Sequence, residues 1–458
     1  MNRSDHRPLF GLITIGLGAS IAPMDFAVNV AFPAITAAFA LDVQQIRWVV
    51  ICYVITYASL MLAFGKLGDV IGHRKVFRAG LLLSTLAFAA CGLAADYPWL
   101  LAARALQGVA TALVLSCAPA LVVVACGEDR RTWALSRYAM TAAVAGIIGP
   151  LAGGLSIELF GWAGVFWFRL PVAVLALVLL SQLPSSMPVA YPLRHLDMIS
   201  ASLLATGLAL LLMAPALWPD APHAAWSLAS GLSGALLLAW FARREREHAE
   251  PTLPAVTLRD PAMRLSNLTS VMVNLTGFAI PLLVPYYLAR IGGFGAAAIG
   301  LLLAAATVGV LTTSAFAPRV VRAIGQRKAA LLGAALVAMA HGLIAWWPMA
   351  PHMAMLVPGL LLHGLGIGLF QVSYADFIVA TLRERDRGVA GSLTVLTRTV
   401  GVIAAAVILT SVLQALEARH LAAGDTAAVA FHAAFRSVFA VSGLLLAAFL
   451  ALSARRAT

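Results

Sequence analysis

Long apolar runs and short polar segments alternate along the whole chain. Most of the apolar runs reach about 18 residues or more, which is the length that an α-helix needs to cross a bilayer. Clusters of Arg, Pro and Gly separate them and predict fourteen membrane helices, at about 9–39, 48–67, 76–95, 99–126, 136–157, 164–183, 197–217, 225–242, 265–289, 296–317, 329–348, 353–377, 389–413 and 433–453. The expected fold class is an all-α integral membrane protein.

Composition agrees with a protein that has the membrane as its solvent. Of the 458 residues, 62% are hydrophobic and only 11% are charged. The net charge of +12 does not indicate a nucleic-acid partner, because the basic residues lie in short clusters between apolar runs. The cysteines lack the spacing of metal ligands. We therefore expect no metal and no cofactor.

The basic clusters predict the orientation of the chain. Lys and Arg gather in alternate connecting segments, chiefly 66–78, 243–264 and 319–328. These segments are cytoplasmic if the N-terminus lies inside. The first apolar run continues to Phe39 and is too long for a signal-sequence core, so we interpret it as a retained helix. Both termini are expected on the cytoplasmic side of the inner membrane.

The order of the runs predicts three parts: an N-terminal six-helix bundle at 1–190, two central helices with a loop at 191–260, and a C-terminal six-helix bundle at 261–458. A weak internal repeat supports two related halves. The stretch "GKLGDVIGHRK" after the second run corresponds to "PRVVRAIGQRK" after the second run of the last six. A transporter built from such repeats holds its cargo near the bilayer midplane between them.

The first of these stretches has the pattern of a conformational latch. Gly65 and Gly72 permit close helix approach and a tight turn, and Asp69 can accept hydrogen bonds from a helix N-terminus or pair with nearby arginines. Arg74 completes the motif. Such a contact holds one conformation and breaks in another. The alternative is a solvated basic turn on the cytoplasmic side.

A second stretch, "AGIIGPLAGG", places Gly149, Pro150, Gly153 and Gly154 in the fifth apolar run. Small residues let two helices touch backbone to backbone, and the proline kinks the helix, which can seal a leak path or provide a hinge. Generic packing of small residues is the alternative.

Together with "LLAARALQGVATAL" and "MDFAVNVAFP", these stretches resemble the major facilitator superfamily and, within it, the fourteen-helix drug:proton antiporters of the QacA and EmrB type. "WAGVFWFRLP" is similar to the start of the sixth helix in that family, with Arg169 where the family has asparagine. The resemblance implies two six-helix bundles with two additional central helices. It also implies export of drugs, toxic compounds or metabolites in exchange for protons.

Asp25 and Arg104 are the candidates for proton coupling. A charged side chain within a membrane helix costs about 2.5–3.5 kcal/mol or more, so each of these residues is expected to have a partner or water. Asp25 beside Arg104 can load and release a proton as the cavity opens to either side. A static ion pair, or an Arg104 that extends to the membrane surface, is the alternative.

Other polar residues in the apolar runs are candidates for lining a substrate cavity: Asn29, Tyr53, Tyr57, Gln107, Asn274, His363, Gln371 and Arg398. For His363, and more so for His341, packing is the favoured interpretation.

The resulting expectation is a monomeric, proton-driven antiporter that exports lipophilic or amphipathic small molecules and contacts only cargo, protons and lipids. The alternatives are an uptake symporter of the same fold, a channel, or a membrane-embedded enzyme. No catalytic cluster supports an enzyme.

Overall fold

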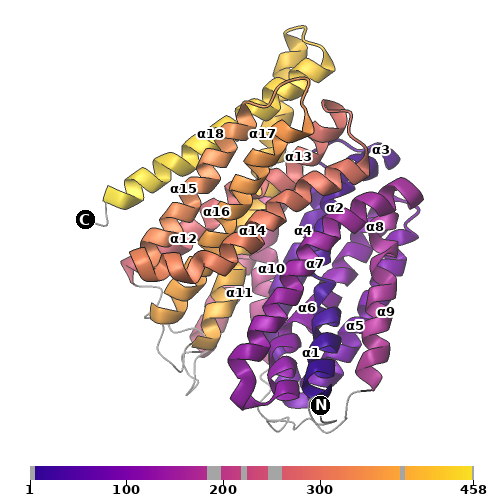
Figure 1. Ribbon diagram of the computed structural model, residues 1–458, viewed down its shortest axis with the longest axis vertical. Coiled ribbons are helices and arrows are strands. Elements are labelled where there is room, and N and C mark those ends of the chain that lie inside the picture. The colour runs from indigo at the N-terminus through magenta and orange to yellow at the C-terminus, as the bar shows by residue number, and fades with distance from the viewer. Residues whose placement is uncertain (1–5, 183–197, 218–223, 246–259, 382–386, 456–458) are drawn as a thin grey trace. The chain divides into compact units, whose positions relative to one another are not determined.

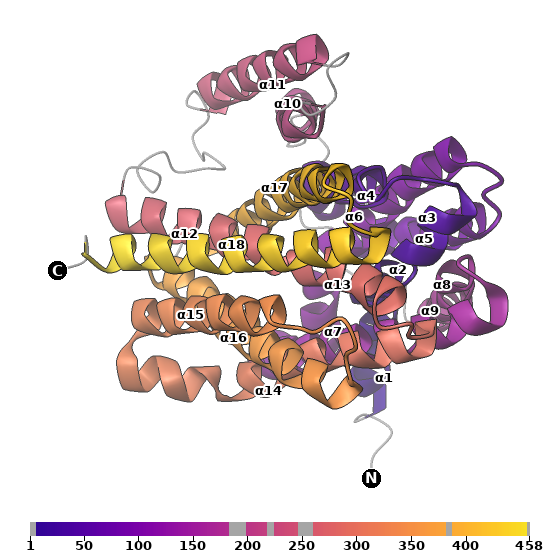
Figure 2. The same ribbon diagram turned by 90° about the horizontal axis from the view of Figure 1, so that it is seen from above.

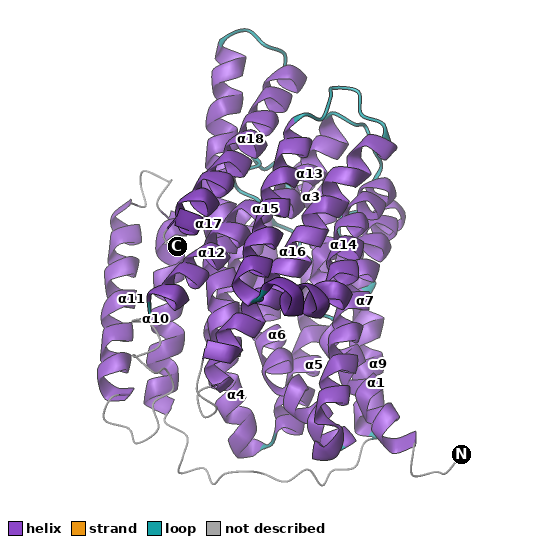
Figure 3. Ribbon diagram, turned by 60° about the vertical axis from the view of Figure 1, so that its left-hand side comes forward, coloured by secondary structure: helices purple, strands orange, loops and turns teal. Residues whose placement is uncertain are grey.

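The computed structural model describes residues 6–182, 198–217, 224–245, 260–381 and 387–455, which form helices joined by short turns (Figures 1 and 3). The chain divides into two compact units. Residues 1–40 and 48–247 form the first unit, and residues 41–47 and 248–458 form the second.

The first unit contains most of the helices drawn from indigo to magenta in Figure 1. Its elements are α1 (His6–Ser20), η1 (Pro23–Asp25), α2 (Phe26–Val30), α3 (Phe32–Ala38), α4 (Arg47–Ile71), α5 (His73–Gly92), α6 (Tyr97–Cys126), η2 (Glu128–Arg130), α7 (Arg131–Phe160), α8 (Gly164–Trp167), α9 (Arg169–Ser181), α10 (Met198–Leu217) and α11 (Ala224–Glu245).

The second unit continues from orange to yellow. Its elements are α12 (Pro261–Gly277), α13 (Ala279–Arg290), α14 (Ala296–Ile324), α15 (Gln326–Ala345), α16 (Met353–Thr381), α17 (Arg387–Ala422) and α18 (Ala427–Arg455).

Twelve helical spans within the described ranges are long and apolar enough to cross a membrane. Arg47–Met61 and Ala63–Ile71 in α4 meet at a 48° bend and make a thirteenth span if they are counted together. In α10 the apolar stretch Ser202–Ala214 is shorter than a span. The prediction of an all-helical, multi-pass membrane fold is confirmed, whereas the count of fourteen is not.

The first predicted helix, at 9–39, is present as one membrane span over Leu9–Val30, followed by the short helix α3. Regular α-helix is interrupted within it by a turn and the 3-10 helix η1 after Ser20, and again at Ala31. Pro23 opens the short helix η1, and Pro33 lies in the first turn of α3, because proline supplies no backbone N–H for a helical hydrogen bond. Asp25 therefore lies at the junction of η1 and α2, where its side chain makes no capping bond and is available to other helices.

The turns that start helices follow local sequence rules. Asp96 caps α6, since its Oδ1 accepts a hydrogen bond from the N–H of Trp99 at 2.8 Å. Gly72 joins α4 to α5 with a φ of 99°, and Gly325 joins α14 to α15 with a φ of 83°. Both values lie in the region that glycine adopts without strain. The two glycines that the repeat aligns therefore have the same handedness of turn.

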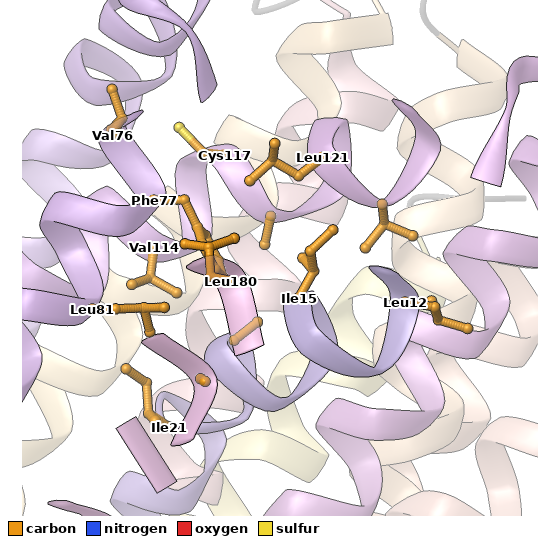
Figure 4. Close-up of a cluster of buried hydrophobic side chains, with 14 of the residues drawn as sticks. Leu12, Ile15, Ile21, Val76, Phe77, Leu81, Val114, Cys117, Leu121 and Leu180 are labelled. Carbon is orange, nitrogen blue, oxygen red and sulfur yellow. The ribbon is translucent and has the colours of Figure 1, made fainter. Parts of the chain in front are cut away.

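The core of the first unit is formed by residues from α1, α5, α6 and α9. Ile15, Phe77, Val114 and Leu180 are fully or nearly fully buried in it (Figure 4). α1 and α9 lie far from α5 and α6 in the sequence, so the packing of the four helices against one another fixes the orientation of α6 and α9, which carry charged residues of interest.

α10 and α11 lie side by side (Figure 2). A Cβ at Gly234 would lie 2.6 Å from the backbone nitrogen of Leu211, so the two helices touch backbone to backbone. The prediction that residues 191–260 form a central part with two helices of its own stays a prediction. Its first boundary, at 190/191, lies outside the described residues.

Candidate functional site: a charge cluster around Asp25

The carboxylate of Asp25 is bound by the forked guanidinium of Arg104. Nη1 of Arg104 lies 2.8 Å from Oδ1 of Asp25, and Nη2 lies 2.9 Å from Oδ2. Two parallel charge-assisted hydrogen bonds of this kind fix both the distance and the plane of the pair. The structure thus brings together the two residues that sequence reasoning selected for proton coupling.

Two further side chains donate to the same carboxylate. Nη1 of Arg169 lies 2.6 Å from Oδ1 of Asp25, and Nε2 of Gln107 lies 2.8 Å from that oxygen. Gln107 also accepts a bond from Nη1 of Arg104 at 2.7 Å. Two guanidinium charges against one carboxylate charge leave the cluster with a net charge of +1.

The four side chains of the cluster come from three parts of the first unit. Asp25 comes from the broken first segment, Arg104 and Gln107 lie one turn apart on α6, and Arg169 is the first residue of α9. Each arginine is also held by a carbonyl: Nε of Arg104 donates to Val49 at 3.0 Å, and Nε of Arg169 donates to its own i−4 carbonyl at 2.8 Å.

The cluster is almost completely removed from solvent. Arg104 is 1% exposed and Arg169 is 0% exposed, whereas the side chain of Asp25 is 13% exposed. Aromatic rings cover the guanidinium faces: the Cζ of Arg104 lies 4.3 Å from the centre of the Tyr53 ring, and that of Arg169 lies 4.6 Å from the centre of the Phe88 ring. Such cation–π contacts stabilise buried cations. The carboxylate is therefore the most accessible charged group of the cluster.

The glycine motif in α7 packs directly against the segment that carries Asp25. A Cβ at Gly149 would lie 3.0 Å from the Cα of Met24, and a Cβ at Gly153 would lie 2.6 Å from the Cβ of Ala27. Since real Cβ atoms are not found under 3.0 Å, Gly153 leaves no room for a side chain. The motif thus allows α7 to contact the residue before Asp25, Met24, and the residue two positions after it, Ala27. Pro150 and Gly154 are buried in the same helix.

The latch motif makes different contacts from those predicted. Asp69 pairs with His73, whose Nε2 lies 3.1 Å from the Oδ1 of Asp69, and it has no arginine partner among the described residues. Asp69 lies near the end of α4 and His73 is the first residue of α5, so the turn at Gly72 brings the two side chains together. Arg74 instead donates from Nη2 to the carbonyl oxygen of Leu180 at 2.8 Å. Gly65 makes only an ordinary contact with α6.

The cavity candidates of the first unit divide into two groups. Tyr53 and Gln107 belong to the charge cluster. Tyr57 lies beside Tyr53, with ring centres 5.3 Å apart, and Asn29 is buried one turn after Asp25 on α2.

None of the described hydrogen bonds, ion pairs or ring contacts joins the candidates of the second unit to one another. Asn274 donates to the carbonyl oxygen of Ser270 in its own helix at 2.8 Å. His363 is buried, whereas Gln371 and Arg398 are exposed.

Sequence reasoning missed two features. Arg169 was noted only as a departure from a family pattern, although a buried arginine is itself a signal that an acid lies nearby. In the second unit, the hydroxyl of Tyr374 lies 2.8 Å from Oδ1 of Asn267 and 3.1 Å from Oγ1 of Thr397, and the latter lies 2.9 Å from Oγ of Ser270. Serine, threonine and tyrosine are common in membrane helices, so no single residue of this polar cluster stood out.

A bundle of membrane-spanning helices with a buried ionic cluster at a helix break has the architecture of a membrane solute transporter. Residues 10–406 match the sequence profile of the Major Facilitator Superfamily, and the chain belongs to this superfamily.

Individual relatives are similar over most of their length. The multidrug resistance protein Stp of Mycobacterium tuberculosis is 27% identical over 91% of this chain and 77% of its own. The cephamycin export protein CmcT of Amycolatopsis lactamdurans is 28% identical over 82% of this chain and 78% of its own. A solved structure of the peptide transporter POT in complex with sulfate is similar in fold, with a TM-score of 0.71 and 16% identity over 96% of this chain and 94% of that one. Family and fold indicate a transporter rather than an enzyme.

Proposed function

We propose that this transporter is a proton-coupled antiporter that exports lipophilic or amphipathic small molecules across the cytoplasmic membrane, with Asp25 as the proton-carrying group. The observation that carries the proposal is a single buried carboxylate held between two arginines from different helices. The similarity to a multidrug resistance protein and to a cephamycin export protein supports export of small molecules.

The charge of the cluster links protonation to conformation. Adding a proton to Asp25 removes the one anion and leaves Arg104 and Arg169 with two uncompensated charges in a desolvated site. A buried charge without a partner is strongly destabilising. The protonated state therefore favours an arrangement in which the arginines separate or reach water, and the deprotonated state favours the arrangement described above.

The proton gradient supplies enough free energy for this cycle. One elementary charge moving through 100 mV yields about 2.3 kcal/mol, which shifts a two-state equilibrium by more than tenfold. In this proposal the protein works as a monomer without a cofactor, and both termini are cytoplasmic. The proposed cargo-lining residues are Asn29, Tyr53, Tyr57, Gln107, Asn274, His363, Gln371 and Arg398.

The test measures proton-driven transport in inverted vesicles. Ethidium, chloramphenicol and taurocholate serve as probes of positive, zero and negative charge, and each is supplied with and without a pH gradient. We expect the wild type to accumulate at least one probe only with the gradient, and Asp25→Asn to lose this accumulation. Transport by Asp25→Asn at the wild-type rate contradicts the assignment of Asp25.

The double variant Asp25→Asn/Arg169→Asn is the matched control. It has no carboxylate but keeps the net charge of +1 that the native cluster carries, so it separates loss of the proton site from loss of charge balance. We expect it to fold and yet to lack proton-driven transport. Accumulation in the opposite direction indicates an uptake symporter, and flux that ignores the pH gradient indicates a channel.

A further inference from the structure

Both ring nitrogens of His341 lie at hydrogen-bond distance from backbone carbonyl oxygens. Nδ1 lies 2.7 Å from the carbonyl oxygen of Val337, and Nε2 lies 3.0 Å from that of Thr276. His341 is 0% exposed. A carbonyl oxygen can only accept, so both contacts are hydrogen bonds only if both nitrogens carry a proton.

A neutral imidazole cannot satisfy this geometry. It has one N–H, so its other nitrogen would direct a lone pair at a carbonyl lone pair in a site closed to water. An unsatisfied buried acceptor costs about 1–3 kcal/mol, and two acceptors facing each other add electrostatic repulsion. The imidazolium form turns both contacts into charge-assisted hydrogen bonds, and these two bonds offset the cost of burying a cation that has no acidic partner.

The other neighbours of the ring are also suited to a cation. The ring of Phe439 is stacked on His341 with 5.3 Å between centres and 27° between planes, so an aromatic face covers the imidazole. Thr276 lies in the last turn of α12, where its carbonyl oxygen faces the ring of His341. The site therefore offers two carbonyl dipoles and one π face to a single positive charge.

His363 on α16 is the nearest titratable neighbour. Its ring is perpendicular to that of His341 with 5.9 Å between centres, and its buried Nδ1 has no hydrogen-bond partner among the described residues. Two charged imidazoles at this distance would repel each other in a desolvated site. Only one imidazole of the pair therefore carries a positive charge: His341 is charged and His363 is neutral.

Arg436 is the charged side chain near His341 among the described residues of the neighbouring helices. Arg436 on α18 donates from Nε to the carbonyl oxygen of Ala345 at 2.8 Å, one turn further along α15. Its side chain is exposed and its charge is screened by solvent. The described contacts of His341 on α12, α16 and α18 are Thr276, His363, Phe439 and Gly443, none of which is acidic.

We propose that His341 is a buried proton-binding site of the second unit, which holds one proton as an imidazolium between the carbonyl groups of Val337 and Thr276 while His363 stays neutral. The site follows from the contacts of the ring and does not depend on the proposed transport function.

Nitrogen-15 spectroscopy tests the proposal directly. The protein is labelled at the histidine ring nitrogens and reconstituted into lipid bilayers, and its spectrum is compared with that of His341→Asn at neutral pH. We expect the difference to contain two ring-nitrogen signals of the protonated type and none of the unprotonated type. A pair with one unprotonated signal overturns the proposal.

His432 is the matched control within the same chain. It is also buried, but its Nε2 faces a single carbonyl oxygen, that of Trp347 at 2.8 Å. We expect the signals lost in His432→Asn to be one protonated and one unprotonated nitrogen. Should His432 give the same pair of signals as His341, the double-carbonyl geometry would have no special meaning and the proposal would fail.

A second measurement needs no substitution in the site. Labelling threonine carbonyl carbons with carbon-13 and histidine rings with nitrogen-15 allows the Thr276 carbonyl to select the Nε2 of His341 in the wild-type protein. That nitrogen is expected to be protonated together with the Nδ1 of the same ring. The result stands even if His341→Asn does not fold.

Discussion

Arg169 and Arg104 donate to the same carboxylate oxygen, Oδ1 of Asp25, at 2.6 and 2.8 Å. The two arginines come from α9 and α6, and their like charges repel each other at this distance. Asp25 is therefore the group that allows both to remain buried in one site. This relationship leads to a set of predictions about charge and stability.

The first prediction concerns charge balance. Asp25→Asn should destabilise the protein by about 3–5 kcal/mol, because it leaves two buried cations without an anion. Arg169→Asn should cost less, because it leaves one cation paired with one anion. The double variant should be more stable than the sum of the single effects implies, by about 0.5–3 kcal/mol. Thermal unfolding in detergent provides the ranking, and strictly additive effects would contradict it.

The second prediction concerns the geometry of Arg104. Arg104→Lys retains the charge but loses the forked contact with Asp25 and the bond to Val49. Each charge-assisted hydrogen bond lost should cost about 1.5–3 kcal/mol. Arg137→Lys is the control, since Arg137 is exposed on α7, and surface changes stay within about 0.5 kcal/mol. Equal unfolding temperatures for the two variants would disprove the role of the fork.

The third prediction concerns the contact between α7 and the Asp25 segment. Gly153→Ala places a methyl group within 2.6 Å of the Cβ of Ala27 and should destabilise the protein by about 1–3 kcal/mol. Gly149→Ala, at 3.0 Å from Met24, should have a smaller effect of the same sign. Gly342→Ala is the control, because a Cβ at this position would meet nothing within 4 Å and alanine favours the helix. A stabilising effect at Gly153 would exclude the close packing.

The fourth prediction concerns the turn that joins α4 and α5. Gly72→Ala forces a side chain into a backbone conformation with φ of 99° and should cost about 1–3 kcal/mol. Gly325→Ala, at φ of 83°, should behave alike because the corresponding turn in the second unit has the same hand. Gly65→Ala should be nearly neutral, since its nearest contact is at 4.0 Å. Unfolding midpoints of the three variants decide this, and a neutral Gly72→Ala would count against strain in the turn.

The sequence was sufficient to predict an all-helical membrane protein and the need of Arg104 for an acid, because an uncompensated charge in a membrane helix is too costly to be accidental. It was not sufficient to predict the break near Asp25. A proline in a membrane helix can kink it, end it or be absorbed by neighbouring groups, and the outcome depends on packing that no local pattern contains.

The contact between Arg169 and Asp25 could not be predicted from the sequence for a related reason. It lies 144 residues from Asp25, and only the packing of α9 against α1 and α5 brings it to the carboxylate. Asp69 contacts His73 on the next helix, although an arginine was among its expected partners. The positive φ of Gly72 sets the direction of the chain between the two residues, and the spacing of residues alone does not predict which side chain this turn brings to the carboxylate.

α9 is anchored at both ends by arginines. Its first residue, Arg169, binds Asp25, and near its last residue the carbonyl of Leu180 accepts a bond from Arg74 in the loop motif. A helix of 13 residues is a stiff rod about 20 Å long. Any axial displacement of this rod must stretch or release both contacts together. The latch motif and the buried carboxylate thus contact opposite ends of one and the same helix.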